Sequence, residues 1–87
     1  MSDIVLPTHE DEVRIGERIA ALLTDPAVDG VFTRLRDEYV AQWRAATDPA
    51  TREAAWLKDA ALAAFRLELQ RIADAGTFAS AMDDARS

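Results

Sequence analysis

The four residues Thr-Asp-Pro-Ala occur twice in this chain of 87 residues, at 24–27 and again at 47–50. An Asp followed by a Pro is typical of a helix start, because the Asp side chain accepts hydrogen bonds from free N–H groups of the first turn and the Pro has no N–H to leave unpaired. The two copies therefore predict helices over 26–46 and 49–75. A duplicated structural unit is the alternative interpretation, but the residues that flank the two copies do not align.

A further helix is predicted upstream, over 9–23. Thr8 and Asp11 have the spacing of a capping box, in which each side chain bonds the backbone N–H of the other residue, and the first turn is acidic. Apolar residues repeat on one face of this segment, namely Ile15, Ile19, Leu22 and Leu23. We therefore expect an amphipathic helix that ends just before the first Thr-Asp-Pro-Ala.

The composition indicates an all-α fold. The chain has 18 Ala, 9 Arg and a single Lys, and Ala and Arg lose little conformational freedom on entering a helix. Its only β-like run is too short to found a sheet and is stopped by Pro7; the run consists of Ile4, Val5 and Leu6. We therefore predict helices without a sheet.

The predicted organisation has three parts, which are an extended N-terminal arm over 1–8, a single helical domain over 9–76 and a C-terminal tail over 77–87. Gly76 is expected to adopt a left-handed conformation just past the end of the third helix. In the tail, Phe78 and Met82 either fold back on the last helical turn or anchor a partner.

The helices predicted over 26–46 and 49–75 are expected to form an antiparallel helical hairpin, because only a short junction separates them. One apolar stripe from each helix, together with the N-terminal helix, supplies the core. The expected core residues are Ile19, Leu22, Val28, Phe32, Leu35, Tyr39, Trp43, Leu62, Phe65, Leu69 and Ile72. Gly30 lies inside the second helix and leaves room for a close contact there.

The third predicted helix also carries a second apolar stripe, nearly opposite the first, which is formed by Trp56, Ala60, Ala63 and Leu67. One partner helix cannot cover two opposite faces, and a chain this short buries only about 60 to 65% of its unfolded surface. We therefore predict a homo-oligomer with this stripe as the partner surface. The arm is expected to dock on a neighbouring molecule through Ile4, Val5 and Leu6. The alternative for Trp56 is packing against Trp43 at the end of the core.

The sequence shows no constellation for catalysis or for binding a metal or cofactor. His9 is the only histidine, and the carboxylates beside it point around the predicted helix instead of converging as metal ligands do. The three Ser residues lie in the terminal segments, and the three Gly residues are isolated, so a catalytic triad and a phosphate-binding loop are both unsupported. We therefore expect a non-enzymatic protein without a cofactor.

Charge and hydropathy bear on partners and location. The net charge of −6 argues against direct binding to a nucleic-acid backbone, whose phosphates are neutralised by Lys and Arg. No apolar stretch approaches the ~18 residues that span a bilayer, and the N-terminus is acidic where a secretory signal is basic. We therefore expect a cytoplasmic protein that does not enter a membrane.

An ordered series of short motifs resembles small helical proteins that tailed bacteriophages and prophages encode, often among their virion and packaging genes. The series spans residues 20 to 80 and comprises Leu-Leu-Thr-Asp-Pro (22–26), Tyr39-Val40-x-x-Trp43, Arg52-Glu53-x-x-Trp56-Leu57, and Leu69-x-x-Ile72-x-x-x-Gly76 with Ala79. The resemblance implies a virion or virion-assembly component of the host cytoplasm or the virion, which contacts itself and other phage structural proteins. It implies no catalytic residues. The alternative is a soluble phage-encoded regulator that inhibits a host protein through an acidic helical surface.

Overall fold

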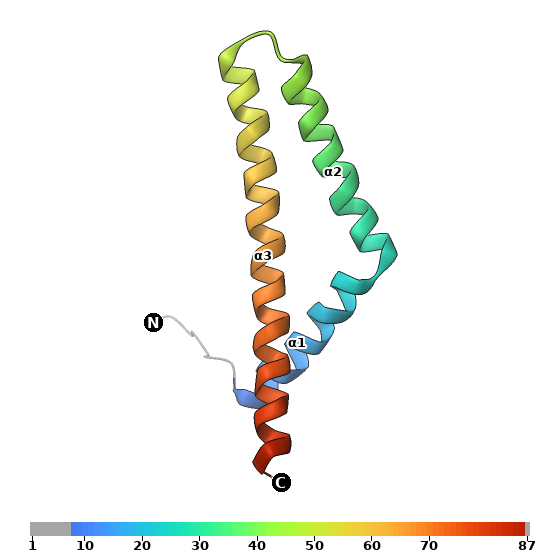
Figure 1. Ribbon diagram of the computed structural model, residues 1–87, viewed down its shortest axis with the longest axis vertical. Coiled ribbons are helices and arrows are strands. Elements are labelled where there is room, and N and C mark those ends of the chain that lie inside the picture. Colours follow the sequence, from blue (N-terminus) through green and yellow to red (C-terminus); the bar gives the residue numbers. More distant parts are fainter. Residues whose placement is uncertain (1–7, 87) are drawn as a thin grey trace, which may run out of the picture.

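The computed structural model describes residues 8–86, and these form three α-helices (Figure 1). They are α1 (His9–Thr24), α2 (Pro26–Ala45) and α3 (Pro49–Arg86). The described part of the chain contains no strand, so the prediction of an all-α fold is confirmed. The predicted arm contacts at Ile4, Val5 and Leu6 lie outside the described residues.

The three helices begin at the positions that were predicted from their capping residues. Thr8 and Asp11 form a capping box, in which the Asp11 N–H donates to Thr8 Oγ1 at 3.2 Å and the Thr8 N–H donates to Asp11 Oδ2 at 3.3 Å. Asp25 Oδ1 accepts from the Ala27 N–H at 2.9 Å. Asp48 Oδ2 accepts from the Thr51 N–H at 2.9 Å. Both copies of Thr-Asp-Pro-Ala are therefore helix starts.

The third helix does not end at Gly76, and the prediction of a tail beyond it is wrong. Gly76 has no positive φ, and α3 continues through it to Arg86. The glycine serves packing instead of termination, because a Cβ on Gly16 of α1 would lie only 2.7 Å from the Cα of Gly76. The helix therefore uses the missing side chain of Gly76 to let α1 approach its backbone.

The helices α1 and α2 both pack against the long helix α3. In Figure 1, α1 crosses the C-terminal half of α3 and runs away from it to the start of α2, and α2 then runs beside the N-terminal half of α3 in the opposite direction to α3. The molecule measures 60 × 39 × 18 Å, so its thinnest dimension holds about two layers of helix. No helix in residues 8–86 is both long and apolar enough to cross a membrane.

This thin arrangement leaves a small core. Among the described residues, the buried ones are all small, namely Gly16, Ala55, Ala73, Gly76 and Ala79. Most of the predicted core residues are half-buried, namely Ile19, Val28, Phe32, Leu35, Tyr39, Leu62, Leu69 and Ile72. The core prediction is wrong in the single chain for three residues, whose exposed fractions are 48% for Leu22, 42% for Trp43 and 58% for Phe65.

The exposure of these three side chains follows from the arrangement of the helices. Leu22 belongs to the last turn of α1, where α1 and α2 meet away from α3 (Figure 1). The ring of Phe65 packs on Phe32 with centroids 6.3 Å apart, but no third layer of helix covers its other side. The guanidinium of Arg52 lies over the ring of Trp43, 5.0 Å from its centroid, and leaves Trp43 42% exposed.

Gly30 makes no close contact, contrary to the expectation from its position in α2. A Cβ at Gly30 would meet nothing within 4 Å, whereas a Cβ at Gly76 would lie 2.8 Å from the Cα of Gly16. The close approach between helices therefore occurs at the crossing of α1 and α3. Small residues spaced three or four apart could have indicated it, since Gly16 and Ala20 share one face of α1, and α3 contributes Ala73, Gly76 and Ala79.

Candidate interaction surfaces

The outward face of α3 presents a continuous exposed surface, which we call the outer stripe. Its residues follow the alternating spacing of three and four that keeps side chains on one helix face, and every one of them is exposed. The outer stripe consists of Leu57, Ala60, Ala64, Leu67, Arg71, Asp74, Phe78, Ala81 and Ala85. The exposed fraction is 53% for Leu57, 55% for Leu67 and 69% for Phe78.

The four partner residues predicted on the third helix lie on or beside this stripe. Ala60 and Leu67 belong to it, and Trp56 and Ala63 flank it toward α2; all four are exposed in the single chain. The prediction covered only the N-terminal half of the stripe. The sequence offered Phe78 as a possible partner anchor, but it did not show that the same helix face continues to Phe78, because the interpretation ended the helix at Gly76.

Phe78 and the neighbouring Met82 do not fold back on a helix end, because α3 runs through both of them. Their side chains are 69% and 42% exposed. Of the two interpretations left open for these residues, folding back is therefore wrong, and both side chains are available to a partner.

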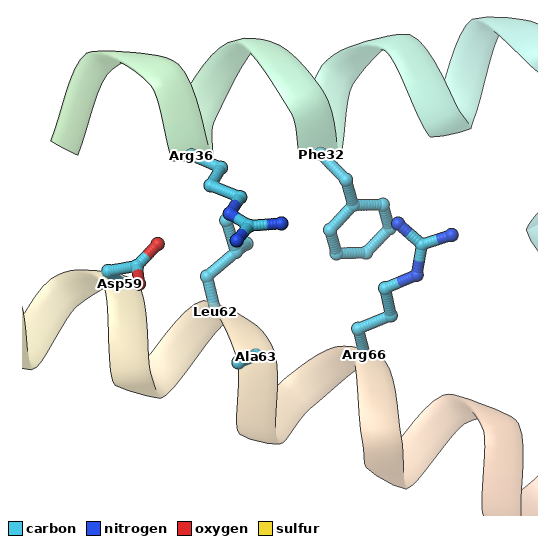
Figure 2. Close-up of a pocket in the computed structure, with 6 residues that line it drawn as sticks. All are labelled: Phe32, Arg36, Asp59, Leu62, Ala63 and Arg66. Carbon is cyan, nitrogen blue, oxygen red and sulfur yellow. The ribbon is translucent and has the colours of Figure 1, made fainter. Parts of the chain in front are cut away.

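A cleft of about 250 Å³ lies between α2 and α3 (Figure 2). Phe32 and Arg36 enter it from α2, and the side chains from α3 are Asp59, Leu62, Ala63 and Arg66. The guanidinium of Arg66 lies 5.3 Å from the centroid of Phe32, and its Nη2 lies 3.1 Å from Asp29 Oδ1. The cleft therefore combines an aromatic ring, two guanidinium groups and the carboxylate of Asp59, and charged groups of either sign can pair with such a lining.

The two tryptophans line one smaller cleft of about 110 Å³ near the connection between α2 and α3. This placement agrees with the interpretation that the indoles close the end of the helix pair. Trp56 is nevertheless 61% exposed, which leaves this residue available to a partner as well. Packing beside Trp43 and contact with a partner therefore both stay open for Trp56.

Acidic residues from both ends of the described chain come together where α1 begins. His9 Nε2 lies 2.8 Å from Asp83 Oδ2, and both side chains are about half exposed. This contact brings the acidic first turn of α1, Glu10 to Glu12, next to the acidic end of α3. Residues 8–86 nevertheless contain no group of three or more His, Cys, Asp or Glu side chains arranged to hold a metal ion.

Comparison of the chain with protein-family models, with curated proteins and with solved structures gave no match. The geometry of these surfaces is therefore the basis for assigning a function.

Proposed function

We propose that this chain acts by protein–protein contact, that it self-associates through the outer stripe of α3, and that it serves as a phage virion or virion-assembly component. The observation that carries the proposal is the outer stripe itself, where Leu67 and Phe78 are more than half exposed on one helix face. Burial of apolar surface is worth about 25 cal/mol per Å², so a face of this kind favours a partner.

The alanines of the outer stripe support self-association. Ala60 and Ala64 lie between Leu57 and Leu67, and alanines allow a second helix to approach closely. The half-buried core adds a second reason, since a chain with few buried side chains gains stability when it associates. The partners proposed are therefore other copies of the chain together with other phage structural proteins.

The phage setting is supported by the series of motifs between residues 20 and 80, which resembles helical proteins of tailed phages. In this setting the protein works in the host cytoplasm or stays in the virion, without a cofactor and without catalysis. The arm at Ile4, Val5 and Leu6 remains part of the proposal as a segment that docks on a neighbour.

The test replaces Leu67 by Asp and uses Val31→Asp as the matched control, because Val31 is 47% exposed on α2, away from the stripe. We expect the unmodified chain and the Val31 variant to associate in sedimentation equilibrium and to be recovered in purified virions. The Leu67 variant should be monomeric and excluded from virions. A chain that stays monomeric at high concentration, and whose Leu67 variant enters virions normally, would contradict the proposal.

The contact between His9 and Asp83 favours one second candidate, the soluble regulator that inhibits a host protein. It gathers acids of α1 and α3 at one end of the molecule, where a basic partner surface would be attracted. This candidate predicts absence from virions and a host partner whose binding weakens with salt. Replacement of Glu10 and Glu12 by Gln should then abolish that binding while Leu67→Asp leaves it unchanged.

A further inference from the structure

The outer stripe carries one charge of each sign in the middle of its apolar run. Arg71 and Asp74 separate Leu67 on one side from Phe78 on the other, and all four side chains are exposed. Among residues 8–86 each charged group has only a local partner on α3, since Arg71 Nη1 lies 3.7 Å from Glu68 Oε2 and Gln70 Nε2 donates to Asp74 Oδ1 at 3.0 Å.

We infer that the outer stripe binds a second copy of the chain with the two α3 helices antiparallel, so that Arg71 of each copy faces Asp74 of the other. The inference rests on the proposed function, which makes this face a contact surface, and it adds the orientation and register of the partner. A contact of this kind is two-fold symmetric, so it closes as a dimer instead of growing into a filament.

The same register matches the rest of the stripe. With Arg71 opposite Asp74 of the second copy, Leu67 lies opposite Phe78, Ala64 opposite Ala81 and Ala60 opposite Ala85. Residues 60–85 of both helices then lie side by side over about 39 Å at the rise of an α-helix. Apolar layers therefore flank the charged pairs on both sides, and the alanine layers let the helix ends approach closely.

Other arrangements leave these charges without compensation. A parallel dimer in register places Arg71 against Arg71 and Asp74 against Asp74, which is repulsive. An antiparallel dimer shifted by one heptad places Arg71 and Asp74 against apolar stripe residues, either Leu67 and Ala64 or Ala81 and Phe78. Charges that lose water without gaining a partner are costly, so the charge pattern selects one register.

The fold leaves the space that this dimer needs. The helices α1 and α2 contact α3 through faces that include its buried residues, namely Ala55, Ala73, Gly76 and Ala79, whereas the outer stripe is exposed. A second α3 can therefore approach without displacing α1 or α2 of either copy.

The register is tested first by exchanging charges. Arg71→Asp places two carboxylates opposite each other in both symmetric layers, and we expect the dimer Kd to rise about tenfold or more. Asp74→Arg should have a similar effect through paired guanidinium groups. The double variant Arg71→Asp/Asp74→Arg restores opposite charges and should return the Kd to within about threefold of the unmodified chain. Circular dichroism of each variant confirms that the helices are formed.

Cross-linking then tests the orientation, because the chain contains no cysteine that would interfere. A mixture of Ala64→Cys and Ala81→Cys chains should form a mixed disulfide under mild oxidation, whereas Ala64→Cys alone should form almost none. Efficient cross-linking of Ala64→Cys to itself, or failure of the charge exchange to restore the dimer, overturns the antiparallel register while leaving self-association intact. An unmodified chain that stays monomeric overturns the proposed self-association as well.

Discussion

The helix α3 meets its two neighbours in different ways. At the crossing with α1, Gly16 and Gly76 bring the two backbones together, and a Cβ on either glycine would lie less than 3 Å from the other helix. Along α2, the contact is made by large half-buried side chains such as Phe32 and Leu62, and a cleft of about 250 Å³ remains between the helices. The contact between α1 and α3 has no space for another atom, whereas the contact between α2 and α3 leaves an open cleft.

This difference shows which contact tolerates change. Tight packing makes added volume costly, because the backbones themselves must separate before a new side chain fits. In the open contact, the stabilisation comes from apolar area that large side chains remove from water, so loss of a side chain is the damaging change. The α1 crossing is therefore sensitive to larger residues and the α2 contact to smaller ones.

The largest expected effect is that of Gly16→Leu. Leucine is a good helix former, so the loss cannot come from helix propensity, and the added side chain must push α1 off the backbone of α3. We expect the free energy of unfolding to fall by about 3 kcal/mol, as measured by urea denaturation followed by circular dichroism. The control is Gly30→Leu, the same change in open space on α2, which should not destabilise the chain. Equal losses for the two variants would show that the crossing is not tightly packed.

A smaller loss is expected from Phe32→Ala in the contact with α2. The change removes the ring that packs on Phe65 and lies under the guanidinium of Arg66. Because Phe32 is only half-buried, we expect a loss of about 2 kcal/mol, below the cost for a fully buried phenylalanine. The matched control is Phe78→Ala, which removes a 69% exposed ring from α3 and should leave unfolding unchanged at concentrations where the chain is monomeric. A loss for Phe78 as large as that for Phe32 would contradict the argument that burial of Phe32 between α2 and α3 sets its contribution to stability.

Features of the fold that depend on neighbouring residues could be predicted from the sequence, and features that depend on distant residues could not. Helix starts are determined by residues within one turn, so Thr8, Asp25 and Asp48 indicated all the observed starts. The end of α3 could not be predicted in this way, because Gly76 has the local features of a helix end and its actual role depends on Gly16, which is distant in the sequence.

The candidate interaction surface of α3 could be predicted from the sequence only in its N-terminal half. The periodicity of α3 placed Trp56, Ala60 and Leu67 on an exposed face, but the error at Gly76 hid the continuation of that face to Phe78. The core prediction failed for Leu22 and Phe65 because hydropathy identifies an apolar face without stating how many helices cover it. Coverage depends on the tertiary arrangement, and here the molecule is only about two helices thick.

The smallest expected effect is the loss of stability in acid that arises at the starts of α1 and α3. The hydrogen bond from the Thr51 backbone lowers the pKa of Asp48 at the start of α3, and hydrogen bonding with Thr8 lowers the pKa of Asp11 at the start of α1; the ordinary value is 3.8. A carboxylate whose pKa is lower in the folded state stabilises the fold above its unfolded pKa, and this stabilisation is lost as the pH falls through the folded pKa. Stability should therefore decrease on acidification below 3.8.

The variant Asp48→Asn separates this titration from other effects of acid. Asparagine still accepts the hydrogen bond at the helix start but carries no titrating group, so the urea midpoint of this variant should fall less between about pH 6 and about pH 2 than that of the unmodified chain. The control is Asp37→Asn, which removes an exposed carboxylate from the interior of α2 and should leave the acid-induced fall unchanged. The start of α1 lies close to the crossing at Gly16, whereas the start of α3 lies far along the chain from Gly76, so we expect Asp11→Asn to reduce the acid-induced fall less than Asp48→Asn does. An equal reduction of the acid-induced fall by all three variants would assign the effect to net charge instead of to the helix caps.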